Sequence, residues 1–283
     1  MKKTGIVLLA VLLAVGLVAC GSPAPTPSPA VSSGPEESPA ALTKVTIGAT
    51  SSPHGELLEK VKPILLEQGI ELEIKIFEDY VLPNTAVADK SLDANFFQHV
   101  PYLESFNTEN KTELVPIASI HYEPLGLYPG KTKTIAELKD GASIAVPNDT
   151  SNEARALMLL ENAGLIKLAE GAGLMATVKD IAENPKNIKI VELQAAQLPG
   201  KLPDVDMAVI NGNYAIASEI PITDALALED KEGTAAQTYA NVIVVRKGDE
   251  ARPELKALCD ALQTQAISDY ITETYAGGVV PMF

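Results

Sequence analysis

Arg155 is the residue in this sequence best suited to bind a small organic anion. Its planar guanidinium can donate two parallel hydrogen bonds to a carboxylate. It follows a run of helix-capping residue types at 150–152, so we expect it in the first turns of a helix, where backbone N–H groups also favour an anion. The alternative is a surface arginine that pairs with Glu153 or Glu161.

Asn211 is a candidate partner for a ligand that carries both an ammonium and a carboxylate. It follows the apolar run Met207–Ile210, which is typical of a buried strand. Its amide oxygen can accept an ammonium hydrogen, and its NH₂ group can donate to a carboxylate. Asn213 could do the same, or it could serve only the turn at 211–213.

Aromatic residues could hold the apolar part of such a ligand. The candidates follow strand-like runs and are Tyr80, Phe97, His99, His121 and, less convincingly, Tyr122. Phe96 and Phe97 point to opposite faces if they lie in a strand, so one of them should be core and the other should face the ligand. The alternative is that these residues have structural roles only. Tyr80 would then be a turn residue, Tyr122 an aromatic residue on a strand surface, and the histidines hydrogen-bonded structural residues.

Strand-like and helix-like segments alternate along residues 44–283. Leu72–Phe77 alternates apolar and charged residues as a half-buried strand does, and Ser151–Ala163 has helical periodicity that Gly164 ends. Two restarts of the alternation across these 240 residues predict two α/β lobes with sheets that are rich in parallel strands and covered on both faces. Ligand sites in such proteins lie at the carboxyl ends of strands and between lobes.

The first residues have the form of a secretory leader. Lys2 and Lys3 precede the apolar run Ile6–Ala19, which at about 14 residues is shorter than the roughly 20 that a membrane-spanning helix needs. The run ends in Leu-Val-Ala-Cys, which resembles a bacterial lipobox and implies cleavage before Cys20 and lipidation of its thiol. The alternative is a plain signal peptide. Six prolines in 21–41 indicate an extended tether.

Charge and cysteine content exclude several functions. Without the leader, 20 basic and 37 acidic residues remain, a net charge of −17 that argues against nucleic-acid binding. With Cys20 lipidated, Cys259 is alone, so no internal disulfide is possible, and its apolar helical neighbours predict that it is buried and inert. The three histidines are dispersed and no phosphate-binding loop or Gly-x-Ser-x-Gly motif occurs, so we expect no metal, no cofactor and no enzyme activity.

Five segments occur in the order found in the methionine-binding lipoproteins that feed ABC importers. They are Tyr80-Val-Leu-Pro-Asn84, Asn95-Phe-Phe-Gln-His99, Val146-Pro-Asn-Asp149 with Arg155, Asn184-Pro-Lys-Asn187, and Ala208-Val-Ile-Asn211. The chain resembles this family from about residue 44 to its end. The resemblance implies an α/β, two-lobed, type II periplasmic-binding-protein-like fold with a hinge between the lobes.

The resemblance also implies domains and a binding site. We expect a leader at 1–19, a tether at 20–43, lobe I at 44–122 plus 223–283, and lobe II at 123–222. The expected ligand residues are Tyr80, Phe97, His99, His121, Asn148, Asn152, Arg155, Asn211 and Asn213. The expected partners are methionine, whose polarizable thioether packs well against rings, an ABC permease with its ATPase subunits, and the membrane through Cys20.

Other functions stay open at this point. The ligand could be D-methionine, a methionine dipeptide or another amino acid. A metal-binding lipoprotein built on His99 and His121, an enzyme and a structural adhesin are less favoured. For the favoured function we expect Arg155→Ala to abolish amino-acid binding with little loss of fold.

Overall fold

The computed structural model of the protein describes residues 41–230 and 234–283. The predicted leader, Cys20 and nearly all of the tether therefore lie outside the described residues. Within them, no helix combines the length and the apolar character that crossing a bilayer requires.

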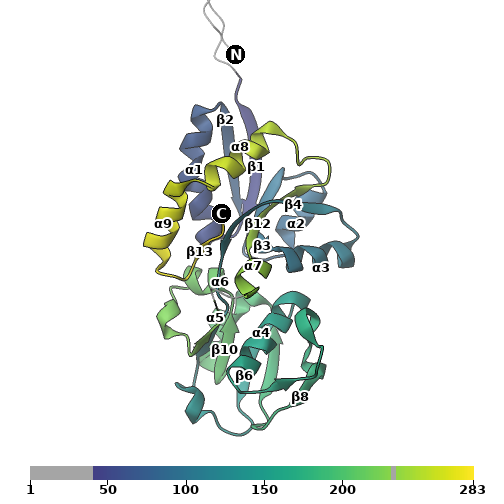
Figure 1. Ribbon diagram of the computed structural model, residues 1–283, viewed down its shortest axis with the longest axis vertical. Coiled ribbons are helices and arrows are strands. Elements are labelled where there is room, and N and C mark those ends of the chain that lie inside the picture. The colour runs from purple at the N-terminus through teal and green to yellow at the C-terminus, as the bar shows by residue number, and fades with distance from the viewer. Residues whose placement is uncertain (1–40, 231–233) are drawn as a thin grey trace, which may run out of the picture. The chain divides into compact units, whose positions relative to one another are not determined.

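The first lobe is built on a mixed sheet of six strands (Figure 1). In spatial order these are β13 (Val280–Pro281), β4 (Leu114–Tyr122), β12 (Asn241–Arg246), β3 (Ala94–His99), β1 (Thr43–Ala49) and β2 (Ile70–Ile76). β1 pairs in parallel with β2 and β3, whereas β12 runs antiparallel to β3 and β4. Sequence-distant segments thus lie side by side.

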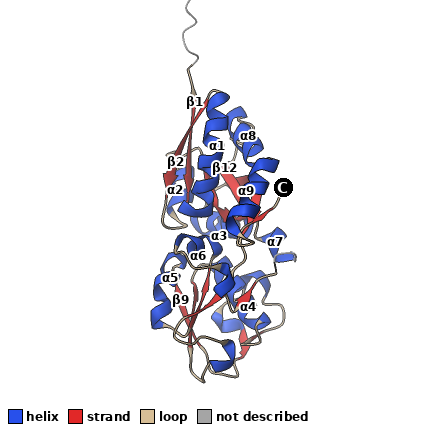
Figure 2. Cartoon of the chain, turned by 90° about the vertical axis from the view of Figure 1, so that its left-hand side faces the viewer, coloured by secondary structure: helices blue, strands red, loops and turns tan. Residues whose placement is uncertain are grey.

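Helices cover both faces of this sheet, as the strand–helix alternation predicts. Helices α1 (Glu56–Glu67), α8 (Pro253–Leu262) and α9 (Gln265–Tyr275) pack on one face, and α2 (Leu82–Ala88) and α3 (Val100–Asn110) on the other (Figures 1 and 2). Leu57, Val61 and Leu65 of α1 are fully buried at helical spacing. Cys259 lies in the same core, and burial raises the pKa of its thiol to about 12.

The second lobe has a five-stranded sheet. Its order is β11 (Ala227–Leu228), β5 (Gly126–Pro129), β10 (Met207–Ile210), β6 (Ser143–Pro147) and β9 (Lys189–Leu193). Helix α4 (Thr150–Asn162) covers one face, and α5 (Leu198–Lys201) and α6 (Gly212–Ala217) cover the other. A small ladder joins β7 (Lys167–Leu168) to β8 (Ile181–Glu183), and α7 (Thr234–Thr238) precedes β12.

The chain passes between the two sheets twice. Residues 123–125 link β4 to β5, and the return lies between β11 and β12. The boundary expected from the sequence, at 222/223, gives β11 to the first lobe, whereas its antiparallel pairing with β5 places it in the second sheet. We therefore propose that the chain returns to the first lobe after Leu228. β11 has only two residues, which is too short for an alternating sequence pattern to predict that it pairs at the edge of a sheet.

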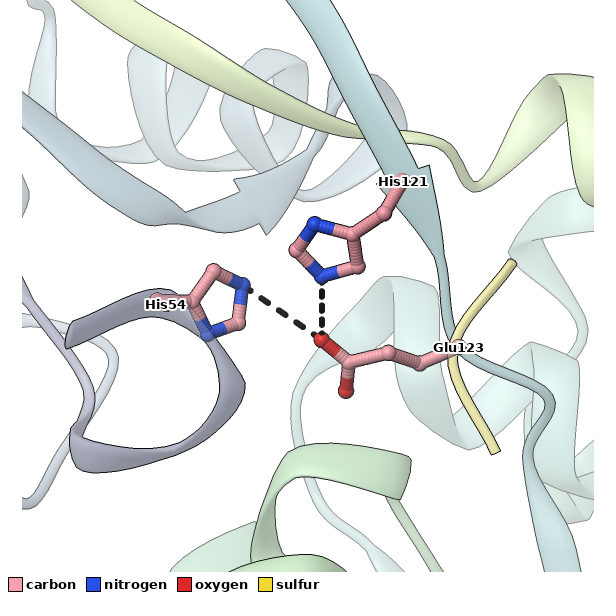
Figure 3. A group of neighbouring side chains, drawn as sticks. All are labelled: His54, His121 and Glu123. Carbon is pink, nitrogen blue, oxygen red and sulfur yellow. Dashed lines mark hydrogen bonds and ion pairs between the residues drawn. The ribbon is translucent and has the colours of Figure 1, made fainter. Parts of the chain in front are cut away.

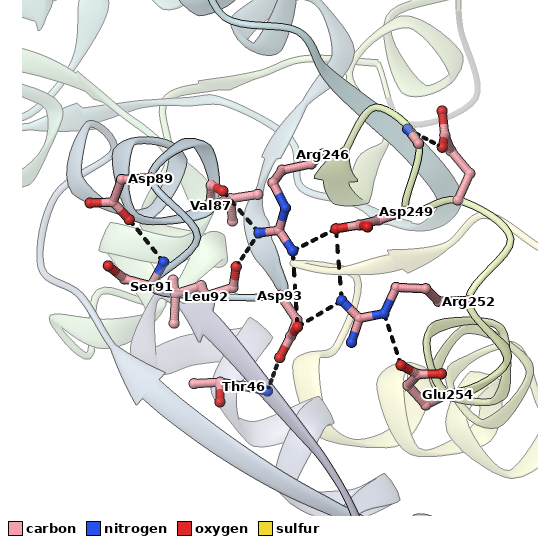
Figure 4. A network of polar contacts seen from close by, with 12 residues as sticks. Thr46, Val87, Asp89, Ser91, Leu92, Asp93, Arg246, Asp249, Arg252 and Glu254 are labelled. Atoms are coloured by element: carbon pink, nitrogen blue, oxygen red, sulfur yellow. Dashed lines mark hydrogen bonds and ion pairs between the residues drawn. The ribbon is translucent and has the colours of Figure 1, made fainter.

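A polar network joins several elements of the first lobe (Figure 4). Asp93 accepts hydrogen bonds from the backbone N–H of Thr46, at 2.8 Å, and from Arg252, at 2.7 Å. Arg246 donates to the carbonyl oxygens of Val87 and Leu92. The network holds β1, β12 and the start of α8 in register.

Candidate functional site

A narrow cavity lies between the two lobes. Seven of the nine ligand residues expected from the sequence line it: Tyr80, Phe97, His99, Asn152, Arg155, Asn211 and Asn213. Its other lining residues are Gln98, Tyr102, Glu123, Gly212 and Asn241. The strand ends of both sheets supply this set, as expected for an α/β protein with two lobes.

Arg155 is buried, with 4 % of its surface exposed, and is held by Glu229. Its Nε donates to Glu229 Oε1 at 2.7 Å, and its Nη2 donates to Glu229 Oε2 and to the carbonyl oxygen of Glu123. Burial would lower the pKa of the guanidinium, but Glu229 outweighs this and raises it. Among the described residues no acceptor binds Nη1, so this donor group is left for a ligand. The alternative pairing with Glu153 or Glu161 does not occur.

The start of α4 is capped one residue earlier than the run at 150–152 indicates. Asp149 is the N-cap, and its carboxylate accepts from the backbone N–H of Asn152 at 3.0 Å and from the Asn152 side chain at 2.9 Å. The Asn152 oxygen is thereby turned away from the cap, and it accepts from Asn211 Nδ2 at 2.9 Å. This chain of bonds fixes both amides at the cavity wall.

His99 is a neutral imidazole that links the lobes. Its Nδ1 accepts from the backbone N–H of Tyr102 at 3.2 Å, so the proton is on Nε2, which lies 3.3 Å from Asn152 Oδ1. Burial, and then the charge of Arg155, lowers the pKa of His99 to about 3. The ring therefore acts as a neutral wall and hydrogen-bond donor at physiological pH.

Aromatic rings form the apolar side of the cavity. The Tyr80 ring lies 5.6 Å from that of Phe97 and 5.7 Å from that of Tyr102, measured between centroids. Phe96 is instead fully buried in the core of the first lobe, so the expected division between the two phenylalanines is found. Tyr80 also donates from its hydroxyl to Asn213 Oδ1 at 2.5 Å, a bond between lobes.

Asn211 offers an acceptor that no described residue satisfies. Its Oδ1 is buried and, among the described residues, has no hydrogen-bond partner. A buried oxygen without a partner is costly, so a ligand donor would be stabilised there. The cavity therefore presents a free guanidinium donor, a free amide acceptor and a ring-lined wall, which suit a carboxylate, an ammonium and an apolar side chain.

The structure places His121 and Asn148 away from this cavity. Asn148 is exposed and lines a neighbouring cavity, and its backbone N–H donates to the carbonyl oxygen of Leu193 at the end of β9. His121 is fully buried in β4, where its Nε2 lies 2.7 Å from Glu123 Oε1. Tyr122 is also buried, and its hydroxyl donates to Glu229.

Sequence reasoning missed Glu229, Glu123, Asn241 and His54. His54, His121 and Glu123 form a buried cluster in which one oxygen of Glu123 faces both imidazoles (Figure 3). Their ligand atoms lie within 4.8 Å of one another, and these residue types can bind zinc. No local spacing reveals this group, because His54 lies 67 or more residues from the others. Glu123 and Glu229 are acidic residues, which are usually exposed, and no sequence pattern around them predicts that their side chains are buried.

The comparisons with known proteins agree with this geometry. The sequence profile of the NlpA lipoproteins matches residues 45–283. The chain belongs to the NlpA lipoprotein family. This member is 38 % identical to the methionine-binding lipoprotein MetQ of Bacillus subtilis, over all of this chain and 99 % of the relative.

Solved structures of relatives are also similar to this NlpA lipoprotein. An ABC transporter periplasmic substrate-binding protein from Coxiella burnetii has 44 % identity and a TM-score of 0.79 over 84 % of this chain and all of its own. A nutrient-binding protein from Burkholderia cenocepacia, solved with methionine bound, has 43 % identity and a TM-score of 0.80 over the same shares. The expected two-lobed periplasmic-binding fold is thus confirmed, as is the resemblance on which it was based.

Proposed function

We propose that this NlpA lipoprotein is a substrate-binding protein that holds methionine between its two lobes and delivers it to an ABC importer. The observation that carries the proposal is the buried Asn211 Oδ1, which has no partner among the described residues, in the same cavity as the Arg155 guanidinium. The methionine bound to the Burkholderia relative supports the choice of ligand.

In this proposal Arg155 and Asn211 bind the two ends of the amino acid. Nη1 of Arg155 donates to the ligand carboxylate, while Glu229 keeps the guanidinium plane fixed from the opposite edge. Asn211 Oδ1 accepts from the ammonium. A molecule that lacks either group leaves a buried partner unpaired and binds far more weakly.

The rings of Tyr80, Phe97 and Tyr102 then pack against the thioether. Sulfur is polarizable and makes favourable contacts with ring edges and faces. His99, Asn152 and Asn213 connect the lobes around the ligand through the hydrogen bonds described above. Binding of the amino acid in this way breaks no covalent bond, and we assign this protein no catalytic role.

We further propose that the protein is anchored outside the cytoplasm by lipid on Cys20 and that an ABC permease with its ATPase subunits receives the ligand. The family membership and the Leu-Val-Ala-Cys sequence support the anchor. The Coxiella relative, described as an ABC transporter component, supports the partner.

Native mass spectrometry tests the ligand assignment. A form of the protein that begins at Gly21 is purified, unfolded to strip small molecules, refolded and offered single amino acids. We expect a methionine-mass adduct before stripping and its recovery with L-methionine. An adduct of another mass, or recovery only with D-methionine or a methionine dipeptide, would change the ligand and keep the class. A failure to bind any of these would refute the proposal.

Membrane fractionation tests the anchor. The full chain should partition with membranes, and Cys20→Ala should release it or leave it unprocessed. Globomycin, which blocks the lipoprotein signal peptidase, should cause the unprocessed form to accumulate. Unchanged processing and partitioning under both treatments would exclude a lipid on Cys20.

A further inference from the structure

Glu123 is a buried acidic side chain in the linker between β4 and β5, with 5 % of its surface exposed, and it lines the cavity. In the described part of the chain, no lysine or arginine side chain forms an ion pair with it. Arg155, the nearest guanidinium, bonds only its backbone oxygen and is neutralised by Glu229. A buried carboxylate without a cation is costly, and a ligand cation would remove that cost.

Two neutral imidazoles hold this carboxylate in place. His54 Nδ1 contacts the Thr50 hydroxyl at 2.8 Å, and its Nε2 faces two acceptors, Asn241 Oδ1 at 3.0 Å and Glu123 Oε1 at 3.4 Å. The proton therefore lies on Nε2, and Nδ1 accepts from the threonine. His121 Nε2 lies 2.7 Å from the same Oε1 and donates to it (Figure 3).

The other carboxylate oxygen, Oε2, lies against the start of α6. A Cβ atom at Gly212 would be 2.7 Å from Glu123 Cβ and 3.0 Å from Oε2, so only glycine leaves the carboxylate this position. Gly212 directly follows Asn211, whose side-chain oxygen has no partner within residues 41–230 and 234–283. The Glu123 backbone meanwhile touches Arg155 Nη2 at 2.7 Å. Glu123 thus lies between the group assigned to the ligand carboxylate and the group assigned to the ammonium.

We propose that Glu123 supplies the negative charge that recognises the ammonium of the ligand, and that His54 and His121 are positioning residues that hold its carboxylate. This inference rests on the proposed amino-acid site and deepens it. Burial raises the pKa of the Glu123 carboxyl, while the charge of Arg155 and a hydrogen bond from the backbone N–H of Asn213 act against that rise, so an incoming ammonium favours the ionised form further.

The consequence is selectivity for a zwitterion over a plain acid. L-methionine offers an ammonium to Glu123 and Asn211, whereas its α-hydroxy analogue offers a neutral hydroxyl at the same carbon. The hydroxyl satisfies the Asn211 oxygen but leaves the Glu123 charge unpaired. The two compounds therefore separate the contribution of charge from that of hydrogen bonding and packing.

Titration calorimetry of the Gly21 form with both compounds tests the inference. We expect Glu123→Gln to weaken L-methionine binding roughly 10- to 100-fold and to change binding of the hydroxy analogue by less than about threefold. Glu153→Gln is the matched control, because Glu153 is also a buried carboxylate but bonds the backbone N–H of Val178 outside the cavity. It should leave both affinities unchanged.

A second variant tests the positioning role and guards against a folding defect. His121→Leu should weaken L-methionine binding less than Glu123→Gln does, and it should have no further effect in the Glu123→Gln background. Equal losses for both compounds in Glu123→Gln, or additive effects of the two substitutions, would overturn the inference and leave the methionine site standing. A wild-type protein that binds neither compound would overturn the methionine site as well.

Discussion

Arg155 and Glu229 form a two-point ion pair although 74 residues separate them. The pair joins α4 to the end of β11, and Tyr122 and the backbone N–H of Leu125 donate to the same carboxylate. Glu229 and the carbonyl oxygen of Glu123 therefore occupy Nε and Nη2 of the guanidinium and leave Nη1 for a ligand. The pair makes Arg155 a structural residue as well as a binding residue.

This pairing changes the expectation that Arg155→Ala is harmless to the fold. The substitution leaves Glu229 buried and unpaired, which costs about 3–5 kcal/mol of unfolding free energy. We expect Arg155→Ala to lose methionine binding and to show this loss of stability in urea titrations. Arg155→Ala combined with Glu229→Gln should regain stability without regaining binding. Full stability in the single variant would contradict a buried pair.

Removal of the Asn211 acceptor should affect binding more than stability. Asn211 makes one side-chain hydrogen bond in the described structure, to Asn152, and its Oδ1 has no partner. We expect Asn211→Ala to weaken methionine binding roughly 5- to 100-fold, as measured by calorimetry. A variant with native affinity would show that the ammonium binds elsewhere.

The hydrogen bond from Tyr80 to Asn213 should contribute to the closed arrangement of the lobes. Tyr80→Phe keeps the ring that packs on Phe97 and removes the 2.5 Å bond. We expect affinity to fall roughly 2- to 10-fold, mainly through faster dissociation, in stopped-flow measurements. Tyr214→Phe is a useful comparison, because its hydroxyl also bonds across the lobes, to the Glu78 carbonyl oxygen, but it does not line the cavity.

Stability should fall as the pH decreases below about 6.5. Burial lowers the pKa of His54 to about 4 and the pKa values of His99 and His121 to about 3, from an unfolded value of 6.5. Between these limits the unfolded chain binds more protons than the folded chain, so acid favours unfolding. Each histidine contributes up to about 1.4 kcal/mol per pH unit. Burial raises the pKa values of Glu123 and Asp149, which act in the opposite direction, so denaturant titrations from pH 7 to pH 5 measure the net slope.

The His99→Asn variant provides the control for this pH dependence. It should reduce the dependence of the unfolding free energy on pH by about the contribution of one histidine. This reduction is expected whether or not the substitution changes the stability at pH 7. A slope that the substitution does not change would mean that His99 is protonated in the folded protein.

Chelators should leave methionine binding unchanged. The cluster of His54, His121 and Glu123 has the residue types of a zinc site, but both Nε2 atoms face the carboxylate as donors. Metal-bound histidines normally donate from their second ring nitrogen to an acceptor. His121 Nδ1 is buried and has no such partner among the described residues. Elemental analysis with a stoichiometric metal, or binding lost to EDTA, would contradict this assignment.

The sequence determined what depends on local pattern and on residue type. The helix that carries Arg155 and the strand before Asn211 follow from periodicity, and alternation separates Phe96 from Phe97. The ordered motifs predicted the family and the fold. Seven of the nine expected residues meet in one cavity because strand ends converge at the carboxyl edges of both sheets.

Only the tertiary structure decided which polar groups are already paired and which are free. Glu229 reaches Arg155, and His54 reaches Glu123, through contacts between segments that sequence spacing cannot relate. These contacts turn His121 away from the cavity and bring Glu123 to it. Burial then makes each remaining unpaired donor or acceptor costly, and this cost, which no local pattern encodes, defines the site.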